Sequence, residues 1–219
     1  MDDSYSRELL GTFLKEEGIC FSWLEESDEK SADLELWLGD QKAIGELKTV
    51  AKRIQGKGIV GEDLGDTVRD KIRKASPQLK NACKNMSPGI LFLLGETRTD
   101  QKFLSWDHVV VAMQGAYTFC WPNFPDGGGA YEKHGKGNRM GKDGQGDAHN
   151  KSISAIAVCR CDYGEGVAEK ISVCCVYHNK YASVPIESGF PRTGNAVEMY
   201  IMDFGKYQFP PPKYPPSDV

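Results

Sequence analysis

The plainest pattern of apolar and polar positions in the chain is a pair of alternating segments, residues 32–38 and 42–50. Alternation with a period of two is typical of β-strands that bury one face. The Gly-Asp dipeptide at residues 39–40 lies between the two segments and predicts a tight turn. The pattern therefore predicts a β-hairpin with apolar side chains on one face and charged side chains on the other.

The hairpin brings charged residues into register. With a two-residue turn, Leu38 pairs with Gln41. Counting outward from that pair sets Asp33 opposite Glu46, and alternation puts Lys48 on the face of Glu46. Like charges opposite each other destabilise a sheet, so the two carboxylates indicate a cation between them, and hard-cation preferences favour Mg²⁺. An ordinary ion pair on a solvent-facing strand is the alternative.

Other periodic segments predict the rest of the first half. A helix at 4–17 and a strand at 19–24 precede the hairpin. The strongest helical pattern spans 62–84, and Pro77 is expected to kink this helix or to split it in two. The run at 89–94 is apolar throughout, which is typical of a central strand that is buried on both faces and parallel to its neighbour.

The second half is expected to extend the sheet. Segments 153–161 and 170–177 predict an antiparallel strand pair. Before them, residues 107–115 fit a helix or a strand, with the helix favoured, and a strand at 117–121 is expected to follow. Residues 122–151 are rich in glycine and polar side chains, which predicts a long mobile loop.

Length and composition are consistent with one domain. The chain has 219 residues, and we expect a single domain at 1–208 followed by an extended Pro-rich tail at 209–219. No apolar run is long enough to span a membrane, and the acidic N-terminus does not resemble a secretion signal. A cytoplasmic, intracellular location is therefore expected, with the seven cysteines as free thiols.

Charge is unevenly distributed along the chain. The formal net charge is −4, yet residues 42–84 hold eleven basic and five acidic residues. A basic segment beside a carboxylate pair suits a site that binds a polyanion, because the basic groups hold the phosphates and the acids hold the metal. The alternative is a solvated helix face with many ion pairs.

An Asp followed about a dozen residues later by Glu-x-Lys on the next strand resembles the PD-(D/E)XK nuclease superfamily. Ala32 stands where a Pro often precedes the Asp in that superfamily. The resemblance assigns Asp33 and Glu46 as ligands of Mg²⁺ or Mn²⁺, and Lys48 as the residue that orients or activates the attacking water. It implies an α/β, restriction-endonuclease-like fold: an αβββαβ core whose mixed sheet is flanked by helices, here extended by the C-terminal strand pair.

The resemblance also suggests residues around this set. Additional candidates for the site are Glu17 on the first helix, Glu35 on the hairpin and Gln78 on the basic helix. The basic residues that follow the Glu-x-Lys motif are candidates for contact with substrate phosphates. They are Lys52, Arg53, Lys57, Arg73, Lys74 and Lys80.

Cysteines on the predicted strand pair offer a rival metal site. Cys159, Cys161, Cys174, Cys175 and His178 have the side chains that zinc prefers. Their spacing is not the one usual for zinc, and adjacent cysteines on a strand face opposite sides of the sheet. Buried thiols in a core are the commoner outcome.

The expected function is that of a Mg²⁺-dependent nuclease. Such an enzyme would hydrolyse phosphodiester bonds, with DNA as the expected partner, as an endo- or exodeoxyribonuclease that functions alone or as a homodimer. The alternative is a catalytically inactive module that keeps the fold and binds nucleic acid or serves in protein assembly. The intact Asp–Glu–Lys set favours the enzyme, and the negative net charge favours the inactive module.

Overall fold

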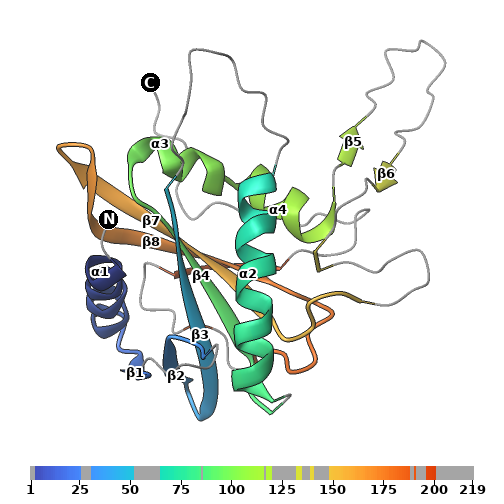
Figure 1. The fold of residues 1–219 in the computed structure, drawn as a ribbon, viewed down its shortest axis with the longest axis horizontal. Coiled ribbons are helices and arrows are strands. Elements are labelled where there is room, and N and C mark those ends of the chain that lie inside the picture. The colour runs from blue at the N-terminus through green and yellow to red at the C-terminus, as the bar shows by residue number, and fades with distance from the viewer. Residues whose placement is uncertain are drawn as a thin grey trace, which may run out of the picture.

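The computed structural model shows an α/β fold in which helices flank a mixed β-sheet (Figure 1). The structure describes residues 3–25, 31–51, 65–84, 86–115, 117–119, 132–134, 139–140, 148–187, 190 and 196–200. The predicted Pro-rich tail lies outside these residues. Most of the predicted loop at 122–151 also lies outside them.

Seven strands form the main sheet of the described residues, in the spatial order β1-β2-β3-β4-β7-β8-β9. They are β1 (Cys20–Trp23), β2 (Leu34–Leu38), β3 (Gln41–Val50), β4 (Gly89–Gly95), β7 (Ala155–Gly164), β8 (Val167–His178) and β9 (Ala196–Tyr200). The three central strands β3, β4 and β7 are parallel, as are β8 and β9, whereas the other neighbours are antiparallel. The predicted strand pair that extends the sheet is therefore confirmed.

The predicted register of the hairpin is also confirmed. Leu38 pairs with Gln41, and the ladder continues to the pair of Leu34 and Gly45. Gly45 permits this close pairing, because a Cβ atom at that position would lie 2.6 Å from Cδ2 of Leu34. Asp33, the residue before β2, donates its N–H to the Gly45 carbonyl at 3.0 Å.

The remaining elements lie before or between the central strands in the sequence. They are α1 (Asp3–Glu16), α2 (Asp66–Cys83), α3 (Arg98–Gln101), the 3₁₀ turn η1 (Lys102–Leu104), α4 (Trp106–Gln114), and the short antiparallel pair β5 (Tyr117–Phe119) and β6 (Glu132–His134). The order from α1 through β1, β2, β3 and α2 to β4 is the order predicted from the sequence.

Two hydrophobic cores cover the two faces of the sheet. In the α1-side core, Leu10 and Leu14 of α1 pack with leucines of β2 and with Phe92. In the α2-side core, Ile72 and Leu79 of α2 pack with side chains of β4, β7 and α4. Figure 1 shows α2 lying in front of the central strands. Alternate residues of the central strands therefore face different helices, which explains why the β4 segment is apolar throughout.

Two expectations about the elements need correction. The helix α2 runs without interruption through Pro77, so the predicted split is wrong; its packing on the sheet through Ala75 and Leu79 compensates for the lost backbone hydrogen bond. The segment predicted to be one mobile loop contains β6. It also contains Met140, which is buried in the α2-side core and donates its N–H to the Met113 carbonyl at 2.7 Å.

The cysteines of the strand pair are buried free thiols. Cys159, Cys161 and Cys174 lie in the α1-side core, whereas Cys175 faces the α2-side core. Burial raises the pKa of the Cys161 thiol to about 12, so the thiolate that zinc requires is disfavoured there. The described residues contain no group of three or more His, Cys, Asp or Glu side chains placed to hold a metal ion, which argues against the zinc alternative.

None of the described helices is both long enough and apolar enough to cross a membrane.

Candidate active site

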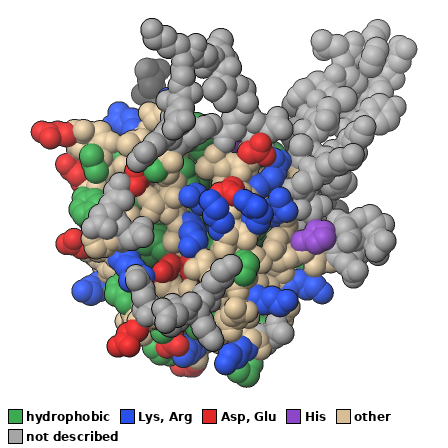
Figure 2. All heavy atoms as spheres, viewed as in Figure 1, with side chains coloured by type: hydrophobic (Ala, Val, Ile, Leu, Met, Phe, Trp, Pro, Cys, Tyr) green, Lys and Arg blue, Asp and Glu red, His purple; other side chains and the backbone are tan. Residues whose placement is uncertain are grey.

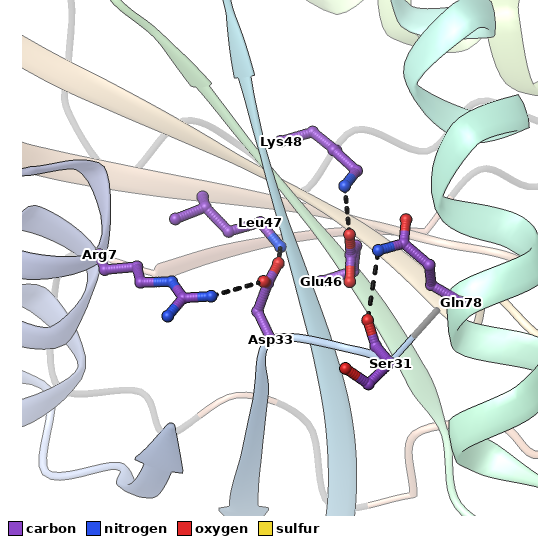
Figure 3. Close-up of polar contacts among 7 residues, drawn as sticks. All are labelled: Arg7, Ser31, Asp33, Glu46, Leu47, Lys48 and Gln78. Atoms are coloured by element: carbon purple, nitrogen blue, oxygen red, sulfur yellow. Dashed lines mark hydrogen bonds and ion pairs between the residues drawn. The ribbon is translucent and has the colours of Figure 1, made fainter. Parts of the chain in front are cut away.

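Asp33, Glu46 and Lys48 come together where β2 begins, beside the longer strand β3 (Figure 3). The β2 ladder stops at Gly45, while β3 continues to Val50. Leu47 packs in the α1-side core, so its neighbours Glu46 and Lys48 share the opposite face of the sheet. The site is thus built where β3 extends beyond its pairing with β2.

The carboxylate of Asp33 is held by two donors from different elements. Its Oδ2 accepts a hydrogen bond of 2.7 Å from the N–H of Leu47, a residue of β3 that lies beyond the pairing with β2. Its Oδ1 accepts from Nη2 of Arg7, on α1, at 3.1 Å. Arg7 is itself held over the Trp23 ring, 5.5 Å from the ring centroid. The side chain of Asp33 therefore continues the strand ladder by one step, and its orientation is fixed.

Glu46 is the buried charge of the site. Its side chain has no exposed surface, and neither of its oxygens accepts a hydrogen bond of good geometry from the described residues. Lys48 Nζ forms an ion pair with Oε1 (Figure 3). Burial raises the pKa of Glu46 to about 7; the charge of Asp33 adds to this effect, and Lys48 opposes it. A buried carboxylate with open lone pairs is an acceptor for a cation or a proton.

The helix α2 carries a further basic residue near the site, Lys71, which is not among the candidates predicted from the sequence. Lys71 is half-buried, and its pKa is lowered by burial and by the positive charges of Lys74 and Lys48. Gln78 lies seven residues later on the same face of the helix. Its amide donates to the Ser31 carbonyl at 3.2 Å, beside Glu46 (Figure 3). The spacing from Lys71 to Gln78 is the sequence signal that would have identified Lys71.

Arg7 is the second residue that the sequence did not identify. Its role depends on the packing of α1 against the edge of β3, and no local pattern around Arg7 encodes that packing. Helical spacing predicts only that Arg7 lies off the apolar stripe of α1.

Two acidic candidates lie away from this cluster. Glu35 forms an ion pair of 2.6 Å with Lys42, nearer to the hairpin turn. Glu17 is buried at the end of α1, and the strand that follows it begins opposite Trp37, at the far end of β2 from Asp33. The structure therefore brings Gln78 to the site. Glu35, two residues from Asp33 along the hairpin, is paired with Lys42, and Glu17 lies toward the far end of β2.

The candidates for phosphate contact are divided among different faces. Arg73 and Lys74 both pair with Asp70 at 2.7 Å, and their side chains are 66% and 56% exposed. Helical phase places Arg73 and Lys80 roughly half a turn from Lys71, whereas Lys74 is its neighbour. Figure 2 shows Lys and Arg side chains gathered over the N-terminal half of α2, with acidic side chains among them. Lys52, Arg53 and Lys57 lie outside the described residues.

The donor set suits a small, hard cation. Asp33 and Glu46 together offer carboxylate oxygens, and those of Glu46 have no hydrogen-bond donor of good geometry among the described residues. Two protein carboxylates are a common complement for Mg²⁺, which retains several water ligands and does not need a cage of three or more protein groups. The absence of a larger His, Cys, Asp or Glu cluster among the described residues is compatible with this type of site.

Comparisons with known proteins add no assignment to this geometry. No protein-family model, no curated protein sequence and no solved structure matches the chain.

Proposed function

We propose that this protein is a metal-dependent nuclease of the PD-(D/E)XK type, which hydrolyses phosphodiester bonds of DNA. The observation that carries the proposal is the fully buried carboxylate of Glu46, which lies beside Asp33 and is paired with the ammonium of Lys48. A buried charge of this kind is costly for folding, and a functional site is the usual reason to retain it. The order of elements from α1 to β4 supports the restriction-endonuclease-like core.

Each residue of the chain has a distinct role in this proposal. Asp33 and Glu46 would hold Mg²⁺ or Mn²⁺, which when bound supplies a Lewis acid for the phosphate and lowers the pKa of a bound water. The Leu47 N–H and Arg7 keep the Asp33 carboxylate in one orientation. Lys48, whose ammonium lies next to Glu46, stabilises negative charge that develops on the phosphate oxygens.

Lys71 would add a second cation on the opposite wall of the site. Its lowered pKa reflects a half-buried ammonium close to other positive charges, an arrangement that binding of a phosphate would relieve.

One observation favours the inactive module as the second candidate. Both oxygens of Asp33 already have protein donors, and Lys48 already neutralises Glu46, so the cluster is also an internally paired network. A module of this kind would keep the fold and bind nucleic acid or protein without cutting. Metal binding separates the two candidates.

Calorimetric titration with Mn²⁺ is the experiment that tests the proposal. The protein is expected to bind one ion, and Glu46→Gln is expected to weaken binding by more than about tenfold, since one of two carboxylates is lost. Because Glu46 must be ionised to bind the ion and its pKa is about 7, the apparent affinity should rise about tenfold from pH 6 to pH 8.

Glu35→Gln provides the matched control, because it removes a carboxylate from the same hairpin that pairs with Lys42 rather than with Lys48. This variant should bind Mn²⁺ as the unaltered protein does. Equal affinities of the unaltered protein and Glu46→Gln would contradict the proposed metal site, as would an affinity that does not change with pH.

A further inference from the structure

A second basic site lies next to the proposed active site. It is a cavity of about 640 Å³ between the α3–η1 segment and the C-terminal part of β7, and we call it the α3–β7 cavity. Arg98, Lys102 and Arg160 line it, and Asp162 is the acidic residue of its lining. The cavity therefore carries a net positive charge.

The three cations of the cavity differ in their pairing from those on α2. Among the described residues, neither Arg98, Lys102 nor Arg160 forms an ion pair, whereas Arg73 and Lys74 on α2 both do. Charges of one sign that are held together repel one another unless a counter-charge binds between them. Their convergence in a hollow suits an anionic ligand with several acceptor oxygens, and a phosphate group fits this description.

A neutral donor in the same cavity supports this ligand type. Gln101 accepts a hydrogen bond of 2.9 Å from the Tyr163 hydroxyl through its Oε1, which fixes the orientation of the amide. Its Nε2 is buried, and it has no hydrogen-bond partner among the described residues. A buried donor without a partner in a polar cavity calls for an acceptor from outside the protein.

The backbone around Arg160 is shaped by a bulge. Arg160 pairs with Val173 and Cys161 pairs with Ile171, so Ser172 is the extra residue between the two rungs. Ser172 also lines the cavity, and its hydroxyl donates to the Arg160 carbonyl at 3.3 Å. Bulges of this kind redirect side chains and are frequent beside functional sites.

The sheet register relates the cavity to Lys48. Lys48 pairs with Leu93 on β4, and Leu93 pairs with Val158 on β7. Arg160 lies two residues further along β7, on the face of Val158. Two strand spacings across and two residues along the strand give roughly 12 Å between the Cα atoms of Lys48 and Arg160.

We propose that the α3–β7 cavity binds a backbone phosphate of the nucleic-acid strand whose scissile phosphate lies at Glu46 and Lys48. The placement of the scissile phosphate rests on the proposed function, whereas binding of a phosphate in the cavity does not. Both positions lie on the α2 side of the sheet, toward the carboxyl ends of β3 and β7, the two parallel strands on either side of β4, and ligands of open α/β sheets bind at such ends. The contact reads no bases and would therefore be independent of sequence.

The test is the binding of a fluorescent single-stranded 12-nucleotide DNA, followed by anisotropy in EDTA, which prevents cleavage. Lys102→Gln combined with Arg160→Gln should weaken binding roughly tenfold and flatten the salt dependence by about one to two units. Lys84→Gln combined with Lys151→Gln is the control, because it removes two exposed charges near the opposite end of the sheet. Thermal melting of both variants checks that the fold is retained.

The outcomes separate this inference from the proposed function. If the unaltered protein cuts DNA and the double variant binds the oligonucleotide as the control does, the cavity assignment is overturned alone. If the double variant loses affinity but the unaltered protein cuts nothing in Mg²⁺, the phosphate site stands and the nuclease does not. Deoxyadenosine monophosphate that competes as tightly as the 12-mer would overturn the assignment to a strand.

Discussion

Lys48→Ala is expected to lower the rate of DNA cleavage by about 10²–10³-fold, the usual cost of losing one group that stabilises transition-state charge. The ammonium of Lys48 lies against Glu46 and is partly exposed toward the space where the substrate phosphate would bind. The fold and the affinity for Mn²⁺ should change little, because the main work of Lys48 is in the transition state. Cleavage is measured under single-turnover conditions at pH 8.5, where Glu46, with a pKa of about 7, is mostly ionised in the unaltered protein.

Lys42→Ala is the matched control for this substitution. Lys42 lies on the same strand and on the same face as Lys48, but it pairs with Glu35 near the hairpin turn. Its removal should leave the rate within about twofold, as expected for a surface substitution away from the site. A Lys48→Ala protein that cuts as fast as the unaltered protein would show that this motif is not the catalytic one.

Glu46→Gln is expected to stabilise the metal-free protein at pH 8 by about 3 kcal/mol. Folding raises the pKa of Glu46 from 4.5 to about 7. Between these two pH values, Glu46 is protonated in the folded protein and ionised in the unfolded chain. The free energy of unfolding therefore falls as pH rises from 4.5 to 7, and it stays low above pH 7. Glutamine mimics the protonated side chain and removes this loss.

Urea unfolding at pH 5 and pH 8 measures this effect. The stability of the unaltered protein relative to Glu46→Gln should fall between these two pH values, and Mn²⁺ should restore it, because a ligand of the folded state stabilises that state. Glu35→Gln, which removes a partly exposed carboxylate, should change stability by less than about 0.5 kcal/mol. A Glu46→Gln protein less stable than the unaltered protein at pH 8 would show that the ionised carboxylate is favourable in the fold.

The hairpin could be predicted because its information is local. A Gly-Asp turn fixes the pairing of Leu38 with Gln41, and alternation then sets the faces of Glu46 and Lys48. The buried strand β4 and the amphipathic helix α2 are also local patterns, each with one dominant period. These elements define the α/β fold, and the hairpin brings together Asp33, Glu46 and Lys48.

Tertiary packing decides the features that could not be predicted. Pro77 stays inside α2 because the helix is held by its apolar stripe, and Met140 is buried because its segment bonds to the end of α4. Arg7 reaches Asp33 across 26 positions of sequence. The α3–β7 cavity joins residues from η1 and β7 that no sequence spacing relates.

Incubation of the purified protein with linear, circular and single-stranded DNA, in Mg²⁺ or Mn²⁺ and in EDTA, tests the central claim most directly. The proposed site requires that the unaltered protein cut at least one of these substrates in the presence of metal. It also requires that Glu46→Gln lose this activity while remaining folded, and that Glu35→Gln retain it. Intact DNA in every reaction of the unaltered protein, or cleavage by Glu46→Gln at the unaltered rate, would contradict the account.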